Sequence, residues 1–359
     1  MTKRAVLIPG EGVGPQVTAA ACRVLEAAGA DIAWEVHQAG AETFVRHKTP
    51  VLAETIEAIR SCGVALKGPL TTPGPSGPYR SPGVQMRAPL GLYAQLRRAR
   101  AWPGVASVAP KADLVVIRAL TEDLSAGVEF PAGSDQARAV IEVARSSGLQ
   151  LSPDAAIGLK PISAEAARRL ARFAFEYATL LGRRKVTVVH KGTVQRFTDG
   201  LFLEAAREVA ASYPGVEFDA RLVDAVCAAL VRSPSSFDVL LAPALYGDIV
   251  SDVAAAVTGG LGLCAGGNFG SGPAVFEAAH GTVPHRAGRD SADPIAMVLT
   301  AAMLAEHLGM VGPAERVRRA VGAVLAESRV GTPDLCEGRA CRMVGTQEMT
   351  DAVIEHLLL

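Results

Sequence analysis

The stretch FDVLLAPALYGDIVSD, residues 237–252, combines an apolar run, a proline and a helical pattern that carries two carboxylates. The apolar residues 239–242 predict a buried strand, which Pro243 ends. Asp248 and Asp252 are four residues apart, which on a helix places both carboxylates on one face. This stretch therefore predicts a strand that leads directly into a helix with a doubly anionic face.

The paired carboxylates of Asp248 and Asp252 have two explanations. Two anions on one helix face repel each other unless a cation lies between them, and oxygen ligands of this kind suit Mg²⁺ or Mn²⁺. Alternatively, the first Asp is favoured by the helix dipole and the second is simply solvated. These two residues alone do not decide between a metal site and a solvated face.

Length and composition indicate a large folded protein without a polyanionic partner. At 359 residues the chain can form two domains or one large α/β unit. Hydrophobic residues at 49% and charged residues at 20% argue against disorder. Lys plus Arg and Asp plus Glu both total 36, so no overall basic charge indicates binding to nucleic acid or membrane. We therefore expect a small-molecule partner.

The N-terminus and the cysteines favour a cytoplasmic protein. The opening MTKRAVLIPGEG passes from basic residues into an apolar run too short for a secretory signal, and no run approaches the length of a membrane span. The six cysteines form no CxxC pair and no zinc-finger spacing. We expect all of them to be reduced thiols that serve as small core or surface residues.

Strand-like and helix-like segments alternate along the chain, which predicts an α/β fold. In the helix after Ser163, an N-cap candidate, the side chains of Leu170, Phe173, Tyr177 and Leu180 repeat at a helical interval and predict one packed apolar stripe. The predicted strands are 5–8, 114–117, 186–189 and 239–242; the predicted helices are 15–29, 163–182, 199–212, 247–258 and 294–308.

Two glycine-rich segments are predicted to be loops. TTPGPSGPYRSPG, residues 71–83, is too rich in Pro and Gly for regular structure, and such loops often bind ligands. Gly10, Gly12 and Gly14 in IPGEGVGP superficially resemble a dinucleotide-binding motif. Their spacing is wrong for that motif and Pro15 follows at once, so a tight strand-to-helix turn is the better interpretation.

Several further residues are candidates for chemistry, each with an ordinary structural alternative. Lys191 follows a predicted strand, where α/β proteins usually place their sites, although a lone lysine there is more often solvated. Asp224 lies in the apolar segment LVDAVCAAL, where a metal or a cation would compensate its charge. Arginines are dense between positions 87 and 118, and guanidinium groups pair bidentately with the carboxylates of a polycarboxylate.

Together these segments resemble the metal-dependent β-decarboxylating dehydrogenases of isocitrate, isopropylmalate and homoisocitrate. The resemblance covers nearly the whole chain, and KGPLTTP, FAFEYA and LVDAVCAALVRSPSSFDVL are most similar to isocitrate dehydrogenase. In chain order the matching motifs are LIPGEGVGP, LKGPLTTP, RAPLGLYAQLR, VIRALTEDLSAGVE, HKGTVQRFTDGLFLE, VDAVC, FDVLLAPALYGDIVSD, GGLGL and FEAAHGTVP. Several motifs in register are far more specific than any one of them.

The resemblance implies an α/β fold of the isopropylmalate dehydrogenase type, with two domains and no Rossmann fold. Residues 1–95 and 259–359 would form a large cofactor-binding domain from both chain ends. Residues 96–258 would form a small domain that carries the contact of a homodimer with shared active sites.

The resemblance also implies roles for individual residues. Catalysis would use Lys191 from the partner subunit. The implied substrate-binding residues are Lys67, Thr72, Ser81, Arg87, Arg97 and Arg118. The implied ligands of Mg²⁺ or Mn²⁺ are Asp248 and Asp252, with Asp224 from the other subunit. The implied contacts of an NAD or NADP cofactor are Glu277, His280, Gly281 and Thr282.

The chain departs from the family at positions close to the expected chemistry. The catalytic tyrosine of the family would stand at Ser125, and an alcohol is a far weaker acid than a phenol. The family's asparagines at Gly83 and Thr193 and its glutamate at Ala119 are also replaced. This clustering indicates an altered substrate or altered chemistry.

The cofactor signals conflict. NAD-type members carry Asp-Ile where this chain has His285 and Arg286, and Asn where it has Asp293. Basic groups suit the 2′-phosphate of NADP, yet Pro333 and Glu337 replace the Tyr and Arg that bacterial NADP-type members use. The sequence favours NADP only slightly.

The sequence thus predicts NAD(P)-linked, Mg²⁺- or Mn²⁺-dependent oxidative decarboxylation of isocitrate or a related 2-hydroxy polycarboxylate. One alternative is a specialised-pathway dehydrogenase of another malate-like acid, favoured by the changes at Ser125, Gly83 and Thr193. The other is a catalytically silent regulatory subunit of a heteromeric isocitrate dehydrogenase, which the three retained Asp residues disfavour.

Overall fold

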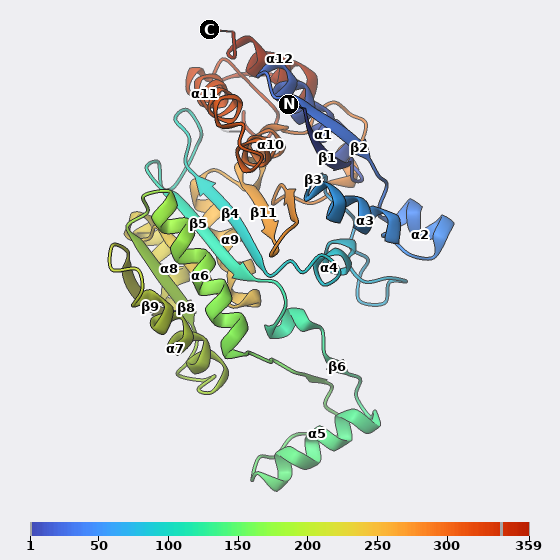
Figure 1. Cartoon of the computed structure of the whole chain (residues 1–359), viewed down its shortest axis with the longest axis vertical. Coiled ribbons are helices and arrows are strands. Elements are labelled where there is room, and N and C mark those ends of the chain that lie inside the picture. Colours follow the sequence, from blue (N-terminus) through green and yellow to red (C-terminus); the bar gives the residue numbers. More distant parts are fainter. Residues whose placement is uncertain (1, 338–339, 359) are drawn as a thin grey trace.

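The apolar runs of the sequence form the inner strands of one ten-stranded sheet in the computed structural model, which describes residues 2–337 and 340–358 (Figure 1). The strand order is β2-β1-β3-β12-β11-β4-β5-β10-β8-β9. The strands are β1 (Lys3–Ile8), β2 (Ile32–Val36), β3 (Val64–Lys67), β4 (Ala94–Arg100), β5 (Asp113–Ala119), β8 (Lys185–His190), β9 (Glu217–Leu222), β10 (Val239–Ala242), β11 (Ala265–Phe269) and β12 (Ala274–Glu277). All four predicted strands are confirmed.

One half of the sheet is built from both ends of the chain. Strand β12 pairs in parallel with β3, so that residues some two hundred positions apart lie side by side. One core cluster packs α1, α10, α11 and α12 against this half, and a separate cluster packs α3 and α4 against it. These helices are α1 (Gly14–Ala27), α2 (Ala41–His47), α3 (Ala53–Cys62), α4 (Pro82–Arg87), α10 (Ile295–His307), α11 (Val311–Glu327) and α12 (Thr346–Glu355). The predicted α/β fold with a half made from both chain ends is confirmed.

The other half of the sheet consists of the middle of the chain. Helices α6 (Ala164–Leu180) and α7 (Thr198–Ala210) pack on one face, and α8 (Val223–Arg232) and α9 (Ala244–Thr258) on the other. The antiparallel strands β4 and β11 join the two halves at the centre of the sheet. A domain boundary near residues 95 and 258 would therefore cut a continuous sheet, and its position stays a prediction.

An arm projects from the body between β5 and α6 (Figure 1). It consists of β6 (Glu129–Phe130), α5 (Asp135–Ser146) and β7 (Ile157–Gly158), with β6 paired to β7. Val143 and Leu149 on this arm are 68% and 63% exposed, which leaves apolar surface open to a partner. Across residues 2–337 and 340–358, no helix has the length and apolar character required to cross a bilayer.

The apolar stripe predicted on α6 is only partly packed. Ser163 caps this helix as predicted, because its hydroxyl accepts a hydrogen bond from the amide of Ala166. Leu170 is buried, but Leu180 is 82% exposed, and Phe173 and Tyr177 line an open pocket. The prediction is wrong for this end of the stripe because the small residues of the adjacent face pack on the sheet and turn Leu180 outward.

The expectation that every cysteine is a free thiol is also wrong. A turn between β13 (Val330–Gly331) and β14 (Arg342–Met343) brings the Cα atoms of Cys336 and Cys341 to 5.7 Å, and the two residues form a disulfide. This Cα separation lies in the ordinary range for disulfides. Sequence spacing alone did not indicate that these two cysteines would pair.

The glycine turn after β1 is a strand-to-helix turn, as predicted, and its glycines are required by close contacts. Gly12 has φ of +63°, and a Cβ there would lie 2.0 Å from the carbonyl oxygen of Thr282. The amide of Val13 donates a hydrogen bond of 2.9 Å to that same oxygen. The turn therefore fixes the position of the segment that contains His280 and Thr282.

Replacing Gly12 by Ala should cost far more stability than the matched change Gly63→Ala. Both glycines have positive φ, so each substitution incurs about 1–2 kcal/mol of backbone strain. A Cβ at Gly63 meets nothing within 4 Å, whereas one at Gly12 collides with Thr282. We expect the loss of unfolding free energy in urea to be at least twice as large for Gly12→Ala. Equal losses would show that the contact between the two turns is dispensable.

Candidate active site

The predicted site residues gather at the ends of strands and at the start of α9. Lys67 and Glu277 end β3 and β12, Lys191 follows β8, and Asp248 lies in α9 directly after β10. Strand β3 is parallel to β12 and β8 is parallel to β10, but the three antiparallel pairings from β12 through β11 and β4 to β5 reverse the direction, so the two groups of strand ends lie at opposite edges of the sheet. The strand ends are the usual location of sites in such folds.

Arg97 lies between the paired carboxylates of α9. Its guanidinium is 2.7 Å from Asp252 and 3.4 Å from Asp248, and it also donates a 2.8 Å hydrogen bond to the hydroxyl of Ser251. The two Asp side chains therefore share one helix face, as predicted. Their repulsion is compensated within the chain by an arginine, so electrostatics alone does not require a metal between them.

Arg118 extends this cluster into the sheet. It is buried on β5, lies 2.9 Å from Asp248 and donates a 2.7 Å hydrogen bond to Gln95. Burial lowers the pKa of Arg118 to about 10, although the nearby carboxylate of Asp248 opposes the shift. Arg87 at the end of α4 interacts electrostatically with Glu277, Asp248 and Arg97, and burial lowers its pKa too. Three cationic groups therefore meet the carboxylates of α9.

A buried ion pair continues the network on the other side. Lys67 and Glu277 occupy opposite positions of the parallel strands β3 and β12, and their charged atoms are 2.6 Å apart. Burial alone would raise the pKa of Glu277, but Lys67 and a hydrogen bond from Asn268 lower it to about 2. Gln95 donates to Asn268 at 2.9 Å and so links this pair to Arg118. One polar network thus spans both halves of the sheet.

Lys191 is held by two carboxylates at a separate place. Its amine is 2.5 Å from Asp224, and its backbone amide donates a 2.6 Å hydrogen bond to the buried Asp199. The hydrogen bond from Lys191 lowers the pKa of Asp224. Asp199 is also paired with Lys160, which lies over the ring of Tyr246. Among the described residues, neither Lys191 nor Asp224 forms an ion pair with the paired carboxylates of the same chain.

Three hydroxyl-bearing residues of the prediction lie in loops or at helix starts. Thr72 is exposed in the Pro/Gly-rich loop, and Ser81 precedes α4 without capping it. Ser125 lies in a short 3-10 helix, Asp123–Ala126, beside α9. Glu11 anchors the loop, because its carboxylate accepts 2.6 Å hydrogen bonds from the amides of Thr71 and Ala41.

The segment after β12 forms a strained turn with an unpaired nitrogen. His280 is half-buried, its Nδ1 lies 3.0 Å from the carbonyl of Gly281, and its inaccessible Nε2 has no partner in the described part of the chain. Burial lowers the pKa of His280, so the ring is held neutral. Val283 after Thr282 has φ of +42°, which is rare for a β-branched residue and typical of functional turns.

Asp293 follows this turn in the chain, and its carboxyl group is buried. Its Oδ1 accepts from the amide of Ile295, whereas its Oδ2 has no partner among the described residues. Burial raises the pKa of Asp293 well above its usual range, and Asp334 adds to the shift. His285 is exposed, and Arg286 is 3.5 Å from Asp334. The unpaired atoms of His280 and Asp293 offer hydrogen-bonding positions to a polar ligand.

A single chain brings the predicted residues together in three groups. The arginines lie with Asp248 and Asp252, Lys191 lies with Asp224, and His280 lies near Asp293. In the described ranges, 2–337 and 340–358, no cluster of three or more His, Cys, Asp or Glu residues could hold a metal ion. A complete metal site within one chain is therefore not present among these residues.

Four residues of this network were not identified from the sequence: Gln95, Asn268, Asp199 and Lys160. Asn268 is a polar residue in an otherwise apolar strand, and Gln95 is a buried amide in a strand that also contains three arginines, which are detectable but weak signals. Asp199 lies in the first turn of α7, where it resembles an ordinary helix-dipole residue. Only the tertiary fold shows which groups these side chains meet.

Comparison with known proteins agrees with this architecture. The family model described as isocitrate/isopropylmalate dehydrogenase matches residues 4–353. A Caenorhabditis elegans protein named probable isocitrate dehydrogenase (NAD) subunit alpha, mitochondrial, is 39% identical over 336 residues, which are 93% of this chain and 87% of that protein. An isocitrate dehydrogenase (NADP) from Archaeoglobus fulgidus is 36% identical, with 97% of this chain and 91% of that protein covered.

A solved structure is similar over the full length. The crystal structure of isocitrate dehydrogenase from Methylococcus capsulatus matches with a TM-score of 0.91 at 39% identity, and the match covers 100% of both chains. The family model, the relatives and this structure agree with the motifs and with the sheet order. The chain therefore belongs to the isocitrate/isopropylmalate dehydrogenase family, with isocitrate dehydrogenases among its similar relatives.

Proposed function

We propose that this chain is a homodimeric dehydrogenase that oxidatively decarboxylates isocitrate or a closely related 2-hydroxy polycarboxylate, with NAD or NADP and with Mg²⁺ or Mn²⁺. The main support is the meeting of Arg87, Arg97 and Arg118 beside the carboxylates of Asp248 and Asp252. Guanidinium groups bind carboxylates bidentately, so three of them suit a substrate with several carboxylates.

The metal ligands would be Asp248 and Asp252, completed by Asp224 of a second copy. The side chains of Asp248 and Asp252 are 50% and 56% exposed, so their hard oxygen ligands are open to a divalent cation. A bound cation would free Arg97 to pair with a substrate carboxylate instead. When bound, the metal polarises the C2 oxygen of the substrate, and the nicotinamide accepts the hydride.

Lys191 would act as the base that takes the proton from the C2 hydroxyl. Asp199 fixes its backbone and Asp224 fixes its amine, so the lysine is oriented before substrate binds. Because this group lies apart from Asp248 and Asp252, each active site would combine Lys191 from one chain with the arginines of the other. The exposed apolar residues of the projecting arm, Val143 and Leu149, support such a dimer.

The cofactor would lie against the segment from Glu277 to Asp293. The unpaired Nε2 of His280 and the neutral carboxyl of Asp293 can accept and donate hydrogen bonds to a heterocyclic base. A protonated Asp offers one donor and one acceptor, as the family's Asn does at this position. Arg286 supplies a positive charge that suits NADP, but its partner Asp334 offsets that charge.

The overall reaction converts the secondary alcohol to a ketone and then releases the β-carboxylate as CO₂. The electron pair left by the departing carboxylate forms an enolate, which must receive a proton. Ser125 cannot donate it as readily as a phenol does, so water would supply it.

Ser125 also favours a second candidate function. A chain without the phenol could serve as a dehydrogenase of another malate-like acid, or as a regulatory subunit beside an active homologue. A silent subunit gains no activity from a restored tyrosine, so the Ser125→Tyr variant separates it from an active dehydrogenase. The metal titration and the mixing of inactive variants add two further tests.

Replacing Asp248 or Asp252 by Asn should weaken Mn²⁺ binding at least about tenfold, because each change removes an anionic ligand. Calorimetric titration of Mn²⁺ into the dimer measures this directly. Asp351→Asn is the matched control, since Asp351 is similarly exposed and also pairs with an arginine. Unchanged Mn²⁺ affinity in both site variants would exclude the assigned metal ligands.

Two inactive variants should restore activity when they are mixed. Lys191→Met and Asp248→Asn would each inactivate both sites of a homodimer. The chains are unfolded together and refolded, so that about half of the dimers pair one variant with the other. Each such heterodimer has one intact site of two, so the mixture should reach about a quarter of the normal rate. Reduced-nicotinamide formation with isocitrate, NAD⁺ or NADP⁺ and Mn²⁺ is the readout. A mixture as inactive as its components would mean that Lys191 and Asp248 serve the same chain's site.

Ser125→Tyr should raise the rate of isocitrate decarboxylation at least about tenfold, because a positioned general acid contributes 10²–10⁴-fold. Ser125→Phe, which fills the same space without the hydroxyl, is the control and should not gain activity. CO₂ release and reduced nicotinamide should be measured together. Equal rates for the Tyr and Phe variants would refute the view that proton supply limits this chain.

A further inference from the structure

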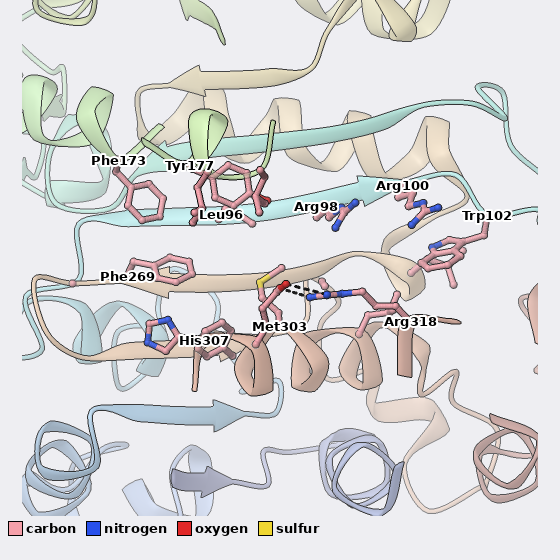
Figure 2. Close-up of a pocket in the computed structure, with 18 residues that line it drawn as sticks. Leu96, Arg98, Arg100, Trp102, Phe173, Tyr177, Phe269, Met303, His307 and Arg318 are labelled. Carbon is pink, nitrogen blue, oxygen red and sulfur yellow. Dashed lines mark hydrogen bonds and ion pairs between the residues drawn. The ribbon is translucent and has the colours of Figure 1, made fainter. Parts of the chain in front are cut away.

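A second cavity lies on the face of the sheet opposite the candidate active site. It has a volume of about 650 Å³, within the range of small-molecule sites. Side chains of α6 and β4 form one wall, and side chains of β11 and α10 form the other (Figure 2). None of the residues with a proposed role in catalysis, metal binding or cofactor binding lines this cavity.

The alternation of side chains along the strands separates the two sites. On β4, Gln95 and Arg97 point to the candidate active site, whereas Leu96, Arg98 and Arg100 line the cavity. The same alternation holds on β11 and β12, where Asn268 and Glu277 belong to the catalytic network and Phe269 and Phe276 to the cavity. The cavity is therefore a distinct site that shares its strands with the active site.

One end of the cavity is apolar, aromatic and uncharged. The ring of Phe269 is 5.2 Å from that of Phe173 and 5.6 Å from that of Phe276. His307 packs on Phe276 at 5.4 Å, and burial lowers its pKa, which keeps the imidazole neutral. Tyr177 completes this end, and burial raises the pKa of its phenol. Such walls favour an apolar chain or ring.

The other end carries one positive charge without a partner. Arg98 is paired with Asp113, and Arg318 with Glu306. Arg100 instead lies over the ring of Trp102 at 4.7 Å and has no carboxylate partner in the part of the chain that the structure describes. Figure 2 shows Arg100 and Trp102 together at this end, across the cavity from Arg318.

Trp102 provides a second, independent observation. Its side chain is only 6% exposed, yet its indole N–H has no hydrogen-bond acceptor among the described residues. An unpaired buried N–H costs stability that a bound acceptor would recover. A carboxylate is a group that accepts this hydrogen bond and neutralises Arg100 at the same time.

We propose that this cavity binds an elongated apolar monocarboxylate, with its carboxylate at Arg100 and Trp102 and its tail among Phe173, Tyr177 and Phe269. Leu96 and Arg100 are four residues apart on β4, so the cavity extends about 13 Å along the strand. This length suits an acyl chain of about ten carbons rather than a compact polycarboxylate. The proposal does not depend on the function proposed above, and its test does not require turnover.

Titration with decanoate tests the proposal on the full-length protein. The chain has two tryptophans, so Trp34→Phe leaves Trp102 as the only emitter, and decanoate below its micellar concentration should change the emission saturably. Arg100→Met should weaken binding at least about fivefold by calorimetry, because it removes the charge-assisted contact. Arg319→Met, an exposed arginine beside Arg318, is the control and should bind decanoate normally. The uncharged 1-decanol should bind more weakly than decanoate.

Three results would overturn the proposal. The first is an emission from Trp102 that decanoate does not change, and the second is equal affinity in Arg100→Met and the unsubstituted protein. The third is an emission that depends on protein concentration rather than on decanoate, which would show that a second copy of the chain covers the cavity. Met303→Trp fills the cavity without altering its charges and should abolish decanoate binding measured by calorimetry. This variant assigns the binding to the cavity independently of Arg100.

Discussion

The ion pairs that cross one face of the sheet constrain the rest of this molecule. Lys67 and Glu277 are linked through Gln95 to Arg118, and Arg118 to Asp248. Burial of any one of these charges without the others would be strongly unfavourable. These residues come from the first third and the last third of the chain. The two halves of the sheet must therefore come together before the charges of these site residues are compensated.

Much of the fold could be predicted from the sequence because its signals are local. Apolar runs such as 239–242 and the capped helix after Ser163 formed as predicted, since each depends on neighbours within a few residues. The outward turn of Leu180 and the disulfide of Cys336 with Cys341 were not predicted. Both depend on which part of the protein a segment contacts after folding. The spacing of apolar residues along the sequence does not contain that information.

The site shows the same division between local and tertiary information. The same-face placement of Asp248 and Asp252 follows from helix geometry alone, but the arginine between them comes from β4, far away in the sequence. Arg97 changes the interpretation of that acid pair, because its charge removes the electrostatic need for a metal in the single chain. The proposed divalent cation would therefore be favoured by substrate and by a second subunit, rather than by repulsion between two carboxylates. Metal affinity and substrate affinity are expected to be coupled for this reason.

Asp293 and Ser125 both depart from the family's residues, and their surroundings affect them differently. Asp293 occupies a buried position that raises the pKa of its carboxyl group, which favours the protonated form and with it the hydrogen-bonding pattern of an amide. Ser125 has no such compensation, because no shift of environment makes an alcohol as acidic as a phenol. Substitutions that look equally severe in the sequence therefore differ in consequence: burial restores the function of one side chain and cannot restore that of the other. The chemistry of this chain should accordingly diverge from its relatives at proton delivery rather than at cofactor binding.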